Sequence, residues 1–216
     1  MNQRIFEMAV SGASGRRIAR LLGCSQNTVL HKIEHLADQA RDHHRKRLAK
    51  VQTSFVMMDE LETFIHARWK QVSVPVVVRP KTGEILAFGV ARIPSSMAKG
   101  IQFNRWVVND RPQVVPTVLA MVSPCLKPTA TIATDGDSNY PKWVARYLPS
   151  VKHTKQKTPV GNTDYDPLFA VNVLFAKMRN DLARLGRKSW TTTKTIQGLE
   201  NHLWLYVAWV NGYRLR

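Results

Sequence analysis

The chain has 216 residues, and its 32 lysines and arginines outnumber its 15 aspartates and glutamates to give a formal net charge of +17. An excess this large favours a polyanionic partner, and nucleic acid is the first expectation. Because no stretch resembles a signal peptide or a membrane span, we expect a soluble cytosolic protein without a membrane partner. Cys24 and Cys125 stand alone, which argues against a disulfide framework or a zinc cluster.

The first forty residues are expected to form helices. Apolar spacing predicts them over 3–11, 15–22 and 26–40. Gly23 separates the last two by a short turn, which is typical of a helix-turn-helix. The third helix would then present side chains that can reach base edges or phosphates, namely Gln26, Asn27, His31 and Lys32. A plain three-helix bundle with a solvated polar face is the alternative.

A basic run follows over residues 41–50. We expect it to be a linker, or an extension of the third helix, that touches the phosphate backbone through Arg45, Lys46 and Arg47. The alternative is a helix face that is merely solvated.

The composition then shifts towards β structure. Strands are predicted over 53–58, 72–79, 85–93, 129–134 and 151–153. Helices are predicted over 112–122, 140–147, 168–185 and 196–213. Up to the final helix, the order of elements is therefore β-β-β-α-β-α-β-α.

Acidic residues end the first and fourth of these strands, at Asp59 and Asp135. The order of elements is that of the ribonuclease-H-like fold, in which those two strands lie side by side. Two carboxylates brought so close repel each other unless cations lie between them. Two Mg²⁺ or Mn²⁺ ions would suit that position and would act on a phosphodiester.

The sequence resembles bacterial transposases of the insertion-sequence-one type, in the DDE superfamily. The resemblance extends over about residues 55–213 and rests on ordered short motifs. These are Met58-Asp59-Glu60, Ala133-Thr134-Asp135-Gly136, the run from Leu182 to Ser189, Thr193-Lys194 and Glu200-Asn201-His202. It implies a transposase that binds the terminal inverted repeats of an element and then catalyses metal-dependent cleavage and strand transfer.

The resemblance also implies a site in which Asp59, Asp135 and Asn172 are both catalytic residues and metal ligands. Asn172 takes the position of the family's third acid, 37 residues after Asp135 (172 − 135). Asparagine offers a carbonyl oxygen but no charge. Asp166 could complete the site instead, although its position favours a helix cap. Further substitutes are Asp164, Asp137 and Glu62.

Basic residues cluster after the helix that carries Asn172. We expect them to hold donor or target DNA by phosphate contacts, with a solvated basic face as the alternative. They are Arg184, Arg187, Lys188 and Lys194.

The resulting expectation is an α/β protein with a helix-turn-helix over 1–40, a basic linker over 41–52, and a ribonuclease-H-like domain over 53–216. That domain would have a mixed sheet, with three antiparallel strands followed by parallel ones, flanked by helices. The partner would be double-stranded DNA in the bacterial cytoplasm, at the nucleoid, and two DNA ends imply a homodimer or a larger assembly. A catalytically impaired transposase that acts as a DNA-binding regulator is one alternative, and a ribonuclease-H-like nuclease is another.

Overall fold

The computed structural model describes residues 1–102, 107–156, 166–186, 191 and 193–216. Contacts within the chain divide it into two compact units. The first, which we call the helical unit, comprises Met1–Arg47, Phe64–Arg68 and Ala176–Arg216. The second, the sheet unit, comprises Leu48–Thr63 and Trp69–Phe175.

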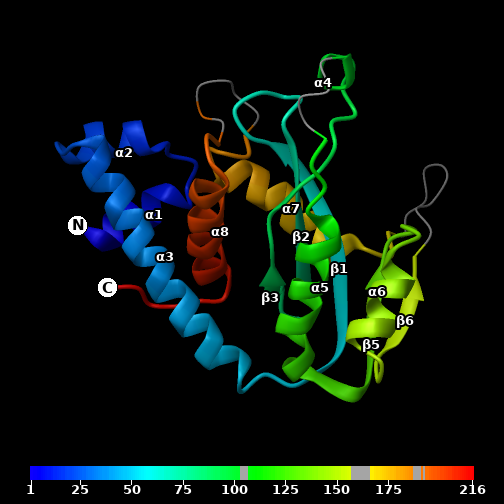
Figure 1. Ribbon diagram of the computed structural model, residues 1–216. Helices are drawn as coiled ribbons and strands as arrows, with labels where there is room; N and C mark the ends of the chain where they lie inside the picture. Colours follow the sequence, from blue (N-terminus) through cyan, green and yellow to red (C-terminus); the bar gives the residue numbers. More distant parts are fainter. Residues whose placement is uncertain (103–106, 157–165, 187–190, 192) are drawn as a thin grey trace. The chain divides into compact units, whose positions relative to one another are not determined.

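The helical unit begins with three helices at the predicted places. They are α1 (Asn2–Ala9), α2 (Gly15–Leu22) and α3 (Gln26–Leu48), and they can be followed in Figure 1. The hydroxyl of Ser14 accepts a hydrogen bond from the backbone N–H of Arg17, and Ser25 caps α3 in the same way through Thr28. Because α3 continues to Leu48, most of the basic run is a helix extension and not a linker.

The last helix, α8 (Ile196–Val210), belongs to the helical unit. This differs from the predicted domain boundaries, which place it with the sheet. Side-chain hydrogen bonds explain the difference, because Arg41 donates to Asn201 over 2.8 Å and the hydroxyl of Tyr206 donates to Asp181 over 3.0 Å. The amide of Gln39 also pairs with both backbone polar groups of Arg216.

The sheet unit contains a mixed, open sheet in the order β3-β2-β1-β5-β6, with β4 paired to β2. The strands are β1 (Thr53–Phe64), β2 (Gln71–Arg79), β3 (Glu84–Phe88), β4 (Ala91–Arg92), β5 (Leu126–Thr134) and β6 (Lys152–Lys155). β2 pairs antiparallel with β3, whereas β5 runs parallel to both β1 and β6. The expectation that the first and fourth predicted strands lie side by side is confirmed.

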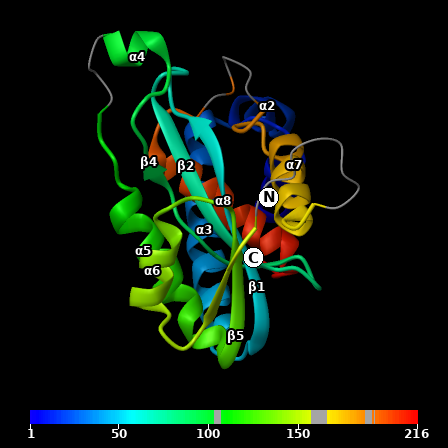
Figure 2. The ribbon, with the colours of Figure 1, turned by 90° about the vertical axis from the view of Figure 1, so that its right-hand side faces the viewer.

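Helices flank this sheet. They are α5 (Arg111–Val122) and α6 (Tyr140–Tyr147). The sheet unit also contains α4 (Ala98–Gln102), the 3₁₀ turn η1 (Ser123–Cys125) and the first part of α7 (Phe169–Asp181), which ends in the helical unit. In Figure 2, α5 and α6 lie on the same side of the sheet. Their apolar side chains, among them Leu119 and Val144, form one buried cluster with Val56, Met58 and Ile132 of the strands.

The predicted third strand is interrupted at Gly89, between β3 and β4. A Cβ at this position would lie 2.5 Å from Cγ1 of Val114 and 3.0 Å from Cγ2 of Val118. Only a glycine lets α5 come this close to the sheet.

Two other predicted boundaries are wrong. The strand that begins at Thr53 does not end at Asp59 but continues to Phe64, because Leu61 is buried and the charge of Glu60 is neutralised inside the fold. The long helix stops at Asp181 and not at residue 185, since the chain closes into tight turns between Leu182 and Gly186. Of the helices that the structure describes, none is long and apolar enough to cross a membrane.

Removing one hydroxyl group, that of Tyr206, tests how much its hydrogen bond to Asp181 contributes to holding α8 in the helical unit. Tyr206→Phe should lower the free energy of unfolding by about 1–3 kcal/mol, because it leaves a carboxylate oxygen of the half-buried Asp181 without its donor. Tyr147→Phe is the matched control at an exposed tyrosine, with an expected change within about 0.5 kcal/mol. Urea denaturation followed by circular dichroism compares the two, and equal effects would contradict this account.

Candidate active site and nucleic-acid surface

The register between β1 and β5 brings two aspartates together in the sheet unit. Phe55 pairs with Thr131 and Met57 with Ala133, an offset of 76 residues (133 − 57). Asp59 and Asp135 have the same offset (135 − 59). They lie two residues beyond the pair of Met57 and Ala133, and continuing the register makes them neighbours. Side chains alternate along a strand, and Met58 points into the cluster under α5 and α6. Asp59 and Asp135 therefore lie on the opposite face.

The carboxyl group of Asp59 is electrostatically strained. Burial and, after it, the negative charges of Asp135, Glu60 and Asp166 raise its pKa to about 6, against one hydrogen bond from the backbone N–H of Glu60 that lowers it. No lysine or arginine of the described chain forms an ion pair with Asp59 or Asp135. Such a carboxylate group favours either protonation or a cation.

Asp166 and Asn172 come to this site from the start of α7. The Nδ2 group of Asn172 donates to one carboxylate oxygen of Asp166 over 2.9 Å, and the other oxygen accepts from the backbone N–H of Leu168 over 2.9 Å. Asp166 thus acts as a helix-capping side chain, and its charge still acts on Asp59. Of the other proposed substitutes, Asp164 lies outside the described residues and Glu62 is exposed on β1.

Arg111, at the start of α5, holds the acidic residues beside this pair in place. Its Nε donates to both carboxylate oxygens of Glu60, over 2.9 Å and 3.2 Å, and its Nη2 donates to Glu60 over 2.6 Å and to Asp137 over 2.9 Å. The side chains of Arg111 and Glu60 are only 22% and 10% exposed. Burial opposes the charge of Arg111, but both carboxylates outweigh it and raise its pKa above the ordinary range.

Two further side chains complete the network around Glu60. The hydroxyl of Tyr140 donates to Glu60 over 2.7 Å, and the hydroxyl of Ser73 also donates to it. Burial and the charge of Glu60 raise the pKa of Tyr140 well above its ordinary value. Glu60 is thereby fixed, and it is the residue that follows Asp59 in β1.

The same network fixes the loop after β5. The backbone N–H of Asp137 donates to Asp135 over 3.1 Å, and the backbone N–H of Asn139 donates to Asp137 over 2.7 Å. Because Arg111 holds Asp137, one guanidinium positions the neighbours of both Asp59 and Asp135.

The donor set suits a divalent cation that keeps part of its water. Across the described ranges, no group of three or more histidines, cysteines, aspartates and glutamates is placed to hold a metal ion. Mg²⁺, however, is commonly held by one or two carboxylates, with water and substrate phosphate as its other ligands. Asp59 and Asp135, a carboxylate pair without a basic partner in the described chain, fit that role.

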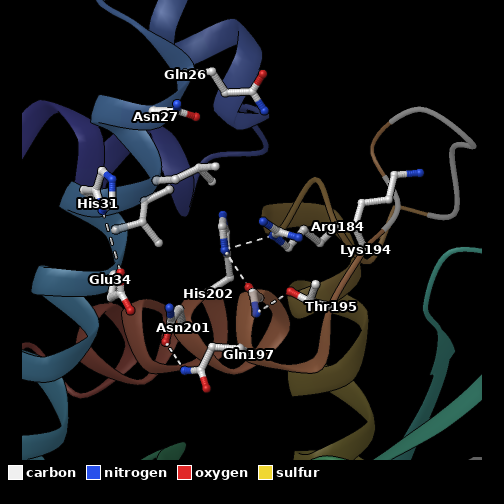
Figure 3. Close-up of a pocket in the computed structure, with 13 residues that line it drawn as sticks. Gln26, Asn27, His31, Glu34, Arg184, Lys194, Thr195, Gln197, Asn201 and His202 are labelled. Carbon is white, nitrogen blue, oxygen red and sulfur yellow. Dashed lines mark hydrogen bonds and ion pairs between the residues drawn. The ribbon is translucent and has the colours of Figure 1, made fainter.

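The helical unit contains a hollow of about 560 Å³ at the start of α3. Gln26, Asn27 and His31 line one side of it, and Figure 3 shows Arg184 and Lys194 on the other. Five of the expected DNA-binding residues therefore come together around one cavity. Lys32 is half-buried on α3 and does not line it.

Arg184 is a half-buried cation in this hollow. Its Nε donates to Nδ1 of His202 over 2.9 Å. Burial, followed by the charge of Arg184, lowers the pKa of His202 to about 3, so the imidazole is neutral and accepts this bond. Burial also lowers the pKa of Arg184, which has no carboxylate partner within the described residues. An anionic ligand would supply the missing charge.

The remaining basic residues are placed differently. Arg45, Lys46 and Arg47 are exposed near the end of α3, where Arg45 forms an ion pair of 2.7 Å with Asp42. Arg187 and Lys188 lie outside the described residues.

Sequence reasoning missed the network of Glu60, Arg111 and Tyr140. No short motif marks it, because its members lie on β1, α5 and α6 and meet only in the folded chain. Comparison with known proteins does not supply it either, since no family model and no curated protein matches the chain.

The raised pKa of Asp59 predicts a pH-dependent gain from Asp59→Asn in metal-free protein. The folded pKa of about 6 lies above the ordinary value of about 3.9. The stability that protonated Asp59 contributes is therefore full below pH 4 and lost as the pH rises through 6. The variant should unfold at a higher temperature than wild type above about pH 7, with the difference shrinking towards pH 4. Scanning calorimetry measures this, Glu62→Gln is the exposed control, and a pH-independent difference would argue against it.

The Arg111 network predicts a large cost for Arg111→Gln. Two partly buried carboxylates would lose their counter-charge, so the free energy of unfolding should fall by about 3 kcal/mol or more. Arg92→Gln, which removes the more exposed pair with Asp110, should cost about 1 kcal/mol or less. Urea denaturation of both variants tests the contrast, and comparable losses would show that the network is not special.

Proposed function

We propose that this chain is a DNA transposase of the DDE superfamily, with a ribonuclease-H-like catalytic domain and a helix-turn-helix that binds DNA. The observation that carries the proposal is the parallel pairing of β1 with β5, because it places Asp59 beside Asp135. The strand order and the α5–α6 layer support the ribonuclease-H-like assignment. The capped α2–α3 pair supports the helix-turn-helix.

In this proposal, Asp59 and Asp135 hold a divalent cation, Mg²⁺ or Mn²⁺. When bound, the cation supplies Lewis-acid polarisation of a phosphodiester and a lower pKa for attacking water. Arg111 keeps Glu60 and Asp137 from competing for the cation, because it already neutralises both. Asn172 and Asp166 are joined by a hydrogen bond, and they offer an amide oxygen and a carboxylate as the third protein ligand of the cation.

DNA recognition would fall to the hollow in the helical unit. Gln26 and Asn27 have the bidentate groups that read adenine or guanine edges. Arg184 and Lys194 would contact phosphates, which would neutralise the otherwise unpaired charge of Arg184. Because two element ends are joined to one target, a dimer or a larger assembly would act.

A DNA-binding regulator without chemistry is the second candidate. One feature favours it: the resemblance places Asn172, which carries no charge, at the position of the family's third acid. Its DNA-binding surface would be the same.

Strand transfer in vitro separates the two candidates. With Mg²⁺ or Mn²⁺ and a DNA fragment that carries the element's ends, wild type should yield joined products, and Asp135→Ala should lower the rate by at least about 10³-fold. Asp166→Asn tests the third ligand position and should reduce the rate of strand transfer less than Asp135→Ala does.

Glu62→Gln, an exposed acid on the same strand as Asp59, is the matched control and should retain the wild-type rate. If wild type binds DNA but yields no joined product, and Asn172→Glu does yield joined product, the function of this chain is that of a DNA-binding regulator.

A further inference from the structure

A second hollow in the helical unit is lined by four arginines. We call it the arginine groove, and its volume is about 750 Å³. Arg16, Arg17 and Arg20 of α2 form one wall, and Arg179 with Asn180 at the end of α7 forms the other. No aspartate or glutamate is among the described residues that line it.

The groove is built by a fixed contact between its two walls. The backbone N–H of Gly12 donates to the carbonyl of Asp181 over 2.6 Å, and this joins the residues before α2 to the end of α7. Gly12 has a φ of +77°, which other residues rarely adopt. The side chain of Asp181 is engaged elsewhere, since it accepts hydrogen bonds from Tyr206 and Asn180.

The charge of the α2 wall is not compensated inside the described protein. Arg16, Arg17 and Arg20 are exposed and form no ion pair there, whereas Arg41 and Arg45 on α3 are paired with Asp38 and Asp42. The three side chains are three and four residues apart around Arg20, so they share one face of α2. That face is opposite the buried Ile18.

The geometry points to the phosphate backbone of duplex DNA as the occupant of the arginine groove. This inference rests on the proposed function and adds a surface beyond the hollow at α3. From Arg16 to Arg20 the helix rises roughly 6 Å, which is close to two 3.4 Å steps of one DNA strand. Each guanidinium can bind a phosphate through two N–H groups. Among the described residues that line the groove, none is an exposed large apolar side chain that would enter a bilayer.

Contacts to phosphates have a signature that contacts to bases lack. Each phosphate contact adds about 0.9 to the salt dependence of the binding constant on a log–log plot, whatever the DNA sequence. A combined Arg16→Gln, Arg17→Gln and Arg20→Gln variant should therefore reduce the slope by about 2.7, and weaken binding at about 0.1 M salt roughly 10²-fold.

Fluorescence anisotropy with the full chain and a short random-sequence duplex measures both quantities. The matched control replaces three exposed lysines of the sheet unit, Lys81→Gln, Lys127→Gln and Lys142→Gln, and so removes the same charge. It should change the slope by less than about 1. Arg20→Gln alone should reduce the slope by about 0.9, and it covers the case in which the triple variant misfolds.

The outcomes separate the two proposals. Binding by wild type with an unchanged slope in the triple variant would overturn the arginine groove while leaving the proposed function intact. Equal losses in the triple variant and its control would also overturn it, because net charge alone would then explain binding. A wild type that fails to bind DNA would remove the proposed function itself. Loss of binding to phosphatidylserine vesicles, with DNA binding kept, would assign the groove to a lipid surface.

Discussion

The acid site depends on one guanidinium. Arg111 binds Glu60 of β1 and Asp137 of the loop after β5, and each of these residues lies close in sequence to one member of the Asp59–Asp135 pair. The arginine does not touch the pair itself. It neutralises the surrounding acids and fixes the backbone, which leaves two carboxylates whose repulsion no cation of the described chain relieves. Glu60, whose charge Arg111 compensates, and Asp59, whose charge has no such partner within the described residues, lie on opposite faces of β1.

The two units show one electrostatic pattern with opposite signs. In the sheet unit, acids without a basic partner in the described chain suit a divalent cation. In the helical unit, Arg184 and the arginines of α2 lack acidic partners among the described residues, so they suit a polyanion. A divalent cation and a nucleic acid are both parts of phosphodiester chemistry, which is why the transposase proposal accommodates the two surfaces together.

Local patterns predicted most helices and strands, because their apolar periodicity and caps act within a few residues. Ser14 caps α2, and the order of the strands correctly indicated that the strands bearing Asp59 and Asp135 are neighbours. Features set by distant contacts could not be predicted. The placement of α8 with the N-terminal helices depends on Arg41 meeting Asn201, which lies 160 residues further along the chain. The continuation of β1 past Asp59 depends on a partner for Glu60 that only the folded chain supplies.

The interruption at Gly89 has a mechanical consequence for the acid site. Any side chain there would collide with Val114 and Val118 and push α5 away from the sheet. Arg111 stands at the first position of that helix, so such a shift would be passed directly to its bonds with Glu60 and Asp137. Gly89, which has no functional group and lies beside the edge strand β3, thus acts as a spacer that lets Arg111 reach the two acids next to the aspartate pair.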